Sequence, residues 1–244
     1  MRIAICDDEK VFAENILRKL KFEFGKRSQE CSFVTVNRGE ELLDICSKEK
    51  IDVVVNMAGT MPAHANRDMM PYVQSIIVGT VNITEWMKTV ECQRIIFNTT
   101  PSDTAEYWGT TTPIDDDVVR SFPKNGNDHA VYAICKRAAT DILEHLQICG
   151  EVKPCVFRHF MVYGWHPIAT YFLEGKERML PWRSMVRKCI QGENLEVYGD
   201  VTRKKELLYI KDFARAVVIA ANNDACGIFN LPGYEPYSLD SMVD

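Results

Sequence analysis

The chain has 244 residues, of which 46% are hydrophobic and 26% charged, and its formal net charge at pH 7 is −5. This composition is typical of a soluble globular protein with one large or two small domains, and it excludes a disordered tail or a collagen-like repeat. The mild acidic excess gives no general attraction to nucleic acid or to an anionic membrane. No apolar run approaches the ~20 residues of a membrane span, and acids interrupt the first apolar run where a signal peptide would continue. We therefore expect a cytoplasmic protein with neither kind of partner.

Strand and helix signals alternate through the first 56 residues. Short apolar runs predict strands, and apolar residues at helical spacing predict helices. The predicted elements are a strand at 2–6, a helix at 11–24, a strand at 31–36, a helix at 40–46 and a strand at 51–56. This β-α-β-α-β order implies parallel strands joined by crossover helices.

The alternation continues and then becomes less regular. The next predicted elements are a helix at 70–90, a strand at 94–98, a polar loop at 107–128, a helix at 130–146 and a strand at 154–160. After an irregular stretch at 165–177 come helices at 182–190 and 213–221 and short strands at 195–198, 206–210 and 227–230. The sequence therefore predicts an α/β fold: a Rossmann-like, doubly wound parallel sheet followed by a small α+β lobe.

The cysteines and histidines do not indicate a metal site. Nine cysteines are present without any C-x-x-C spacing, and the five histidines form no ligand cluster. Most of the cysteines lie inside apolar segments, where a free thiol serves as a small core residue. We expect neither zinc nor a redox dithiol.

The most specific local feature is a Tyr-x-x-x-Lys pair on the predicted helix 130–146. Tyr132 and Lys136 lie four residues apart, so both side chains are on one face. A lysine cation beside a phenol favours the phenolate and lowers the tyrosine pKa from ~10. A phenol tuned in this way can act as a general acid or base on a hydroxyl or carbonyl group. The alternative is a surface tyrosine beside a solvated lysine.

Two predicted strand ends add polar and small residues. Asn98, Thr99 and Thr100 end one strand, where a hydroxyl could bind the substrate oxygen that Tyr132 protonates, or could simply cap a turn. Residues 56–59 (NMAG) end another strand, where small residues let the backbone approach a cofactor, or form a plain turn. Ligands of open α/β sheets bind beyond the carboxyl ends of the strands, so these features are expected to share one site.

From about residue 52 onward, the sequence resembles the extended short-chain dehydrogenase/reductase family of NAD-dependent nucleotide-sugar epimerases and dehydratases. Besides the Tyr132 and Lys136 pair, the resemblance rests on ordered blocks at 52–59 (DVVVNMAG), 79–82 (GTVN), 158–164 (RHFMVYG), 180–183 (LPWR), 195–200 (LEVYGD) and 208–212 (LYIKD). Several blocks in the family's order make this resemblance specific.

The resemblance implies a catalytic site and a cofactor. Tyr132 would be the base, Thr100 would orient the substrate, and Lys136 would also bind the nicotinamide ribose. The cofactor is NAD or NADP, and its other implied contacts are Asn56, Ala58 and Gly59.

The resemblance also implies a nucleotide-sugar substrate and a homodimer. Arg158, Tyr163 and Lys205 fall on substrate-binding positions, and Lys205 stands where the family usually has an arginine. Met161 replaces the family's asparagine, which puts the nucleotide-sugar contacts in doubt. Dimers of the family form through the helix that bears Tyr132 and its neighbour.

The front of the chain departs from this family where the dinucleotide should bind. The family opens with a strand, a glycine-rich loop and a helix, because glycines let the backbone approach the pyrophosphate at the helix N-terminus. Here the first strand is followed by residues 6–10 (CDDEK), and no glycine precedes Gly25. Carboxylates at this turn would repel a pyrophosphate, so we expect impaired cofactor binding.

This front segment resembles a response-regulator receiver domain instead. The matching blocks are 1–9 (MRIAICDDE), 36–43 (VNRGEELL) and 50–55 (KIDVVV). Asp7 and Asp8 would form the receiver's magnesium pocket and are weak metal candidates, or they cap the next helix. Met57 stands where the phospho-accepting aspartate would follow the third strand.

We therefore predict a chimeric chain with a receiver-like fragment at 1–55, a reductase-like Rossmann part at 52–164 and an incomplete, C-terminally truncated substrate lobe at 165–244. Three functions stay open: an epimerase or dehydratase with impaired cofactor binding, a receiver-like signalling protein without the usual phosphoacceptor, and an inactive chimeric or truncated product.

Overall fold

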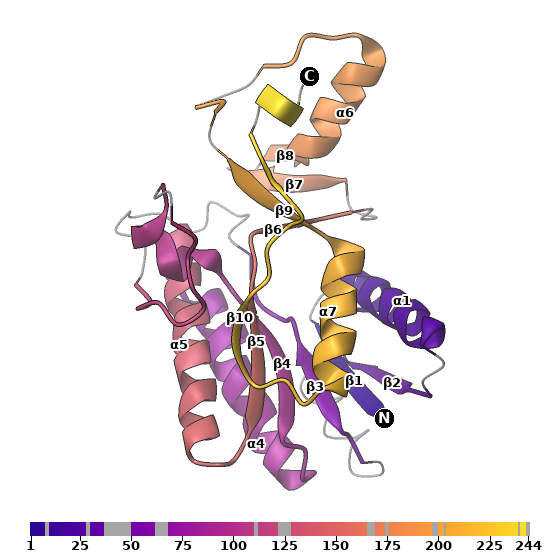
Figure 1. The fold of residues 1–244 in the computed structure, drawn as a ribbon, viewed down its shortest axis with the longest axis vertical. Coiled ribbons are helices and arrows are strands. Elements are labelled where there is room, and N and C mark those ends of the chain that lie inside the picture. The colour runs from indigo at the N-terminus through magenta and orange to yellow at the C-terminus, as the bar shows by residue number, and fades with distance from the viewer. Residues whose placement is uncertain are drawn as a thin grey trace.

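The computed structural model describes residues 1–7, 10–27, 30–36, 50–61, 68–109, 112–121, 128–164, 169–173, 176–196, 200–202, 204–238 and 240–242. Its centre is a six-stranded sheet with the order β10-β5-β4-β3-β1-β2 (Figure 1). In that order the strands are Gly227–Asn230, Lys153–Arg158, Arg94–Thr99, Val53–Asn56, Arg2–Cys6 and Ser32–Val36. Every pairing is parallel. The predicted α/β fold with a parallel sheet is confirmed.

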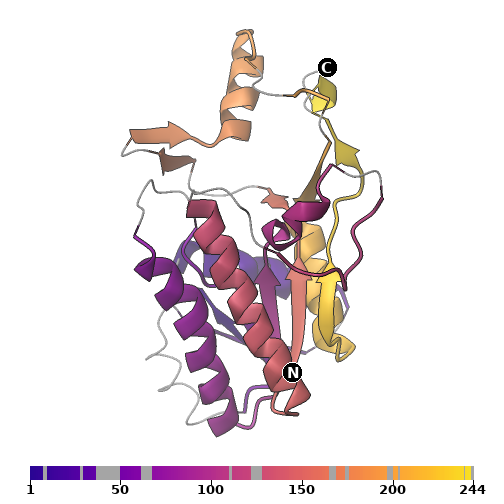
Figure 2. The same ribbon diagram turned by 90° about the vertical axis from the view of Figure 1, so that its left-hand side faces the viewer.

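Helices cover both faces of this sheet. α1 (Lys10–Lys26) and α7 (Ile210–Asn222) pack together on one face. The other face carries α4 (Gly79–Thr89) and α5 (Asp128–Ile148) (Figures 1 and 2). Two separate apolar clusters fill the two interfaces, and neighbouring residues of a strand belong to different clusters, as in Ala4 and Ile5. Burial on both faces is the physical reason that the strands are almost continuously apolar.

The predicted helix at 70–90 is present, but its middle is wound more loosely. α3 (Met70–Tyr72) passes into a π-helical segment η1 (Val73–Val78) and then into α4. The polar loop predicted at 107–128 is preceded by a 3₁₀ segment η2 (Pro101–Tyr107), which begins directly after Thr100. The predicted helix at 40–46 lies outside the described residues.

The remaining elements form a smaller α+β region beyond one end of the main sheet (Figure 1). They comprise β6 (Met161–Tyr163), β7 (Thr170–Leu173), β8 (Lys176–Met179), α6 (Pro181–Gln191), β9 (Lys205–Tyr209), β11 (Pro236–Tyr237) and η3 (Asp240–Met242). β11, β9 and β6 make a three-stranded sheet, and β7 pairs with β8. The prediction of an irregular stretch at 165–177 is wrong over β7 and the start of β8, because the charged residues of β8 give little apolar alternation. The predicted boundaries at 55 and 164 stay a prediction.

The strand order defines where ligands are expected. From β1 the chain passes to β2 on one side and then to β3 on the other, so the order reverses between β1 and β3. Doubly wound sheets bind ligands at such a switch point, beyond the carboxyl ends of the strands. Cys6 of β1 and Asn56 of β3 are paired in register, so Asp7 and Met57 are the first residues beyond the paired ends of these strands.

Candidate functional site

The centre of the site is a buried lysine on α5. The Lys136 side chain is 1% exposed, and its Nζ donates a hydrogen bond of 3.1 Å to Oδ1 of Asn98 at the end of β4. The same Nζ lies 4.6 Å from the centre of the Phe97 ring. A buried ammonium is costly unless polar or π groups surround it. This lysine is therefore held in place at the carboxyl end of the sheet instead of pointing to solvent.

The turn after β3 approaches the same ammonium. The backbone N–H of Ala58 donates to Oδ1 of Asn56 at 3.2 Å, which fixes the turn. A Cβ atom added to Gly59 would lie 3.1 Å from Cγ1 of Ile76 and 3.5 Å from Nζ of Lys136. Glycine is thus needed for the close approach of this backbone to α5 and η1. The structure brings together the predicted cofactor residues Asn56, Ala58, Gly59 and Lys136.

Tyr132 lies one turn before Lys136 on α5 and is buried. The Lys136 Nζ is 5.9 Å from the centre of the Tyr132 ring. Burial raises the pKa of Tyr132 to about 12. The predicted lowering of this pKa is wrong for this arrangement, because desolvation of the phenolate dominates and the lysine donates to Asn98. At neutral pH Tyr132 is a neutral phenol that can donate a proton.

The Tyr132 pKa predicts how stability depends on pH. The folded-state pKa of about 12 is above the ordinary tyrosine value of ~10, so the folded state holds this proton more tightly than the unfolded state. The stabilisation is complete below pH ~10 and is lost as the pH rises through the folded pKa, by about 2–3 kcal/mol in all. Urea unfolding at pH 9 and pH 11 should show this loss, and Tyr132→Phe should reduce it. An unchanged pH dependence in the variant would contradict the assignment.

The hydroxyl residues at the end of β4 are both buried but differ in their contacts. Thr100 Oγ1 accepts a hydrogen bond of 3.2 Å from the backbone N–H of Ser102 and so caps η2. Thr99 Oγ1 is buried and has no hydrogen-bond partner within the described part of the chain. The capping alternative therefore describes Thr100 in this structure, and its substrate-orienting role stays a prediction.

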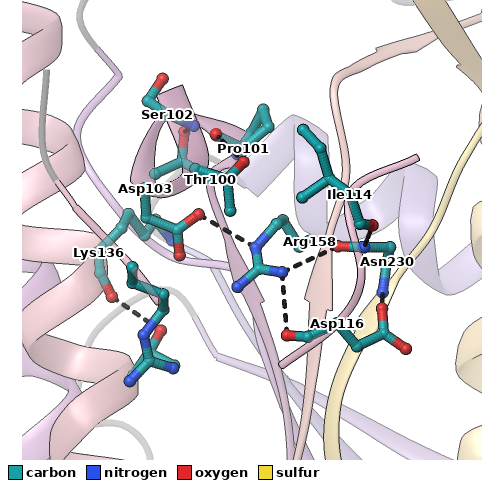
Figure 3. A network of polar contacts seen from close by, with 12 residues as sticks. Thr100, Pro101, Ser102, Asp103, Ile114, Asp116, Lys136, Arg158 and Asn230 are labelled. Atoms are coloured by element: carbon teal, nitrogen blue, oxygen red, sulfur yellow. Dashed lines mark hydrogen bonds and ion pairs between the residues drawn. The ribbon is translucent and has the colours of Figure 1, made fainter. Parts of the chain in front are cut away.

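Arg158 at the end of β5 is held in a buried polar network (Figure 3). Its Nε donates to Oδ1 of Asp103 at 3.0 Å, and its Nη1 donates to Oδ1 of Asn230 at 2.9 Å and to the backbone carbonyl of Asp116 at 3.3 Å. Arg158 is 4% exposed and Asp103 0%. Burial raises the pKa of the Asp103 carboxyl, an effect that Arg158 opposes. The network ties η2, the segment 112–121, β5 and β10 together.

The other two predicted substrate residues lie on the three-stranded sheet. Tyr163 of β6 is half exposed, and its ring centre is 5.3 Å from that of Tyr209 on β9. Lys205 is exposed at the start of β9. The substrate-binding roles of Arg158, Tyr163 and Lys205 stay predictions, and Arg158 already has protein partners for two of its three nitrogens.

Two contacts of the site are not predicted from the sequence. Asn98 binds Lys136, and the signal for it is a polar side chain directly after the apolar run 95–97. Asp103 pairs with Arg158 across 55 residues of sequence, and no local pattern indicates that contact.

The acidic pair after β1 is only partly described. Asp7 is 5% exposed, and its backbone N–H donates to the carbonyl of Val36 at 3.2 Å, so the pairing of β1 with β2 extends to this residue. Asp8 lies outside the described residues. Across the part of the chain that the structure describes, no group of three or more metal-ligating side chains is found, and no helix there is long and apolar enough to cross a membrane.

The fold and the Tyr-x-x-x-Lys helix define a class of proteins, and comparison with known proteins identifies it. The model of the NAD dependent epimerase/dehydratase family matches residues 9–231. The chain belongs to this family.

Individual relatives agree with this assignment. The chain is 24% identical over 225 residues to a UDP-glucuronate 4-epimerase from Thermodesulfobacterium geofontis, a match that covers 90% of the chain and 64% of that protein. The chain thus spans less than two thirds of that relative's length. Among solved structures, UDP-N-acetylglucosamine 4-epimerase from Bacillus cereus superposes with a TM-score of 0.74 at 16% identity, covering 100% of the chain and 79% of that structure. UDP-glucose 4-epimerase from Thermus thermophilus in complex with NAD gives a TM-score of 0.74 at 15% identity, with 100% and 81% covered.

These comparisons do not support a receiver-like front or a chimeric chain. The family model begins at residue 9 and so includes most of the segment 1–55. The strand order at the front occurs in more than one doubly wound family, so the early β-α-β pattern does not distinguish between them. Met57, at the expected phosphoacceptor position, packs in an apolar cluster.

Proposed function

We propose that the chain acts as an NAD-linked epimerase or dehydratase on a nucleotide sugar, with weakened cofactor binding. The observation that carries this proposal is the buried Lys136 ammonium, which reaches from α5 to Asn98 and to the turn at Gly59, one helical turn from Tyr132. UDP-sugar epimerases among the relatives and NAD in a similar structure support the substrate and cofactor classes.

In this proposal the residues have separate roles. NAD, when bound, would take up and return a hydride. Tyr132 exchanges a proton with the sugar oxygen; as a neutral phenol it serves directly as the acid, and acts as the base once a bound ligand brings positive charge near its oxygen. Lys136 donates hydrogen bonds to ribose hydroxyls, and Asn98 orients its ammonium.

The residues of the site suit the nicotinamide ribose of a dinucleotide better than its pyrophosphate. Lys136, Asn98 and the close backbone at Gly59 suit a nicotinamide ribose, which offers hydroxyls and no charge. The β1 end carries the buried Asp7 and no glycine, and does not suit a pyrophosphate. Cofactor binding is therefore proposed to be weak. The signalling alternative is not favoured, since the side chain of Met57, at the expected phosphoacceptor position, has no oxygen to accept a phosphoryl group.

The homodimer implied by the family resemblance also remains a proposal. The exposed apolar residues Val81 of α4 and Ile134 of α5 support it, because both helices lie on the same outer face of the sheet.

Titration with NADH tests the proposed function. We expect a saturable rise in nicotinamide fluorescence within the millimolar range, and we expect Lys136→Met to weaken the affinity by about tenfold or more, since charge-assisted hydrogen bonds are lost. Lys88→Met is the matched control, because this lysine pairs with Glu85 and Glu151 on the outer surface. No saturation at millimolar NADH, or equal effects of the two substitutions, would contradict the proposal.

A further inference from the structure

Two aromatic rings remain partly exposed at the edge of the main sheet where the site lies. Trp108 follows η2 and is 36% exposed, and Phe160 follows β5 and is 39% exposed. Their ring centres are 5.8 Å apart, with an angle of 43° between the ring planes. Single exposed apolar side chains are ordinary, whereas contiguous exposed apolar surface marks ligand sites and interfaces. This ring pair is therefore a candidate contact surface for a ligand.

The ring pair lies near the proposed cofactor position. Asn98, which accepts a hydrogen bond from Lys136, is paired in register with Phe157, and Phe160 comes three residues after that partner. η2 begins at the carboxyl end of β4 and contacts α5, and Trp108 directly follows η2. Both rings thus belong to segments beyond the carboxyl ends of β4 and β5, at the end of the sheet toward the smaller α+β region (Figure 1). Ligands of doubly wound sheets bind at this edge.

A buried ion pair connects the two segments that carry the rings. Nε of Arg158 at the end of β5 donates to Oδ1 of Asp103 in η2 at 3.0 Å, and both side chains are shielded from water (Figure 3). Phe160 lies two residues after Arg158, and Trp108 five residues after Asp103. The backbone N–H of Trp108 also donates to the carbonyl of Ala105 at 3.3 Å. The ring pair is therefore held in place before a ligand binds, so that little conformational entropy is lost on binding.

An aromatic face suits the sugar of a nucleotide sugar better than the diphosphate. The face of an aromatic ring carries partial negative charge, so it attracts the slightly positive C–H groups of a pyranose and repels phosphate oxygens. The sugar is also the part that must lie beside the nicotinamide for a hydride to be exchanged. We infer that Trp108 and Phe160 form a stacking surface for the pyranose ring of the substrate, beside the proposed nicotinamide position at Lys136. This inference rests on the proposed function, because it names a contact for the same substrate.

Calorimetric titration with two ligands, without added cofactor, tests the inference. UDP-glucose carries the pyranose, and UDP lacks it but keeps the base and the diphosphate. Trp108→Leu and Phe160→Leu each remove one ring and keep an apolar side chain, while Trp108→Phe keeps a ring. Phe22→Leu is the matched control, because Phe22 is 55% exposed on α1, on the opposite face of the sheet from α5, where the Lys26 ammonium lies over its ring. Urea unfolding checks that each variant is folded.

We expect Trp108→Leu and Phe160→Leu to weaken the affinity for UDP-glucose by about three- to tenfold and the affinity for UDP by no more than about twofold. Trp108→Phe should keep most of the affinity, and Phe22→Leu should change neither ligand. An equal loss of UDP affinity would assign the rings to the base, and unchanged UDP-glucose affinity would mean that the rings only pack two segments together. Either result overturns the inference and leaves the proposed function intact. A natural chain that binds neither UDP-glucose nor NADH overturns both.

Discussion

Replacing Arg158 by methionine is expected to lower the free energy of unfolding by about 3–5 kcal/mol, because the substitution leaves the Asp103 carboxylate buried without its cation. The side chains of this pair are 3% and 0% exposed, so water cannot replace the lost contacts. Asn230 and the Asp116 carbonyl lose their donor at the same time. Urea unfolding followed by circular dichroism measures the change.

Two further variants make this result specific. Arg215→Met removes an arginine from an ion pair with Asp212 in which both side chains are more than half exposed, and it should cost less than ~1 kcal/mol. Adding Asp103→Leu to Arg158→Met should recover part of the loss, because no unpaired charge is left buried. If Arg158→Met lowers the free energy of unfolding no more than Arg215→Met does, the buried network does not stabilise the fold. The same conclusion follows if Asp103→Leu lowers the stability of Arg158→Met by a further full penalty.

Replacing Tyr132 by phenylalanine is expected to reduce turnover by about 10²–10⁴-fold and to leave ligand binding nearly unchanged. The hydroxyl is the proposed proton carrier, and general acid–base catalysis contributes a factor of this size. The ring itself stays, so packing of α5 against the sheet is kept. Conversion of UDP-glucose and UDP-glucuronic acid at millimolar NAD, followed by chromatography, measures kcat and KM separately.

The control for this prediction removes a hydroxyl elsewhere. Tyr72 of α3 is also buried but lies on a different helix, so Tyr72→Phe should change kcat by less than twofold, the ordinary effect of a change outside the reacting groups. A parallel loss of kcat and of NADH affinity in Tyr132→Phe would mean that the tyrosine positions the cofactor instead of transferring the proton.

The main elements of the fold are visible in the sequence because they depend on local patterns. The strands are continuous apolar runs, as at 53–55, and buried parallel strands need that composition on both faces. The long helices show apolar residues at helical spacing. The β7–β8 hairpin lacks such a pattern, since Lys176, Glu177 and Arg178 are charged, and pairing within the hairpin defines it instead.

Local sequence patterns likewise predict only part of the candidate site. The four-residue spacing of Tyr132 and Lys136 places both on one helix face, and the polar strand ends at 56–59 and 98–100 predict their position at one edge of the sheet. Residues distant in sequence cannot be predicted from such patterns. Asn98 lies 38 residues from Lys136, and Asp103 lies 55 residues from Arg158, yet these contacts hold both cations.

The sequence by itself therefore determined the doubly wound sheet, the Tyr-x-x-x-Lys helix and the missing glycine loop, since each is a matter of residue type and spacing. Only the tertiary structure decided the direction of the Tyr132 pKa shift and the position of Asp7 at the switch point. The physical reason is that desolvation and charge pairing depend on what surrounds a group in space. The Tyr132 pKa is raised because the folded chain buries the phenol, and Asp7 follows the end of β1 at the switch point because β2 and β3 pair on either side of that strand.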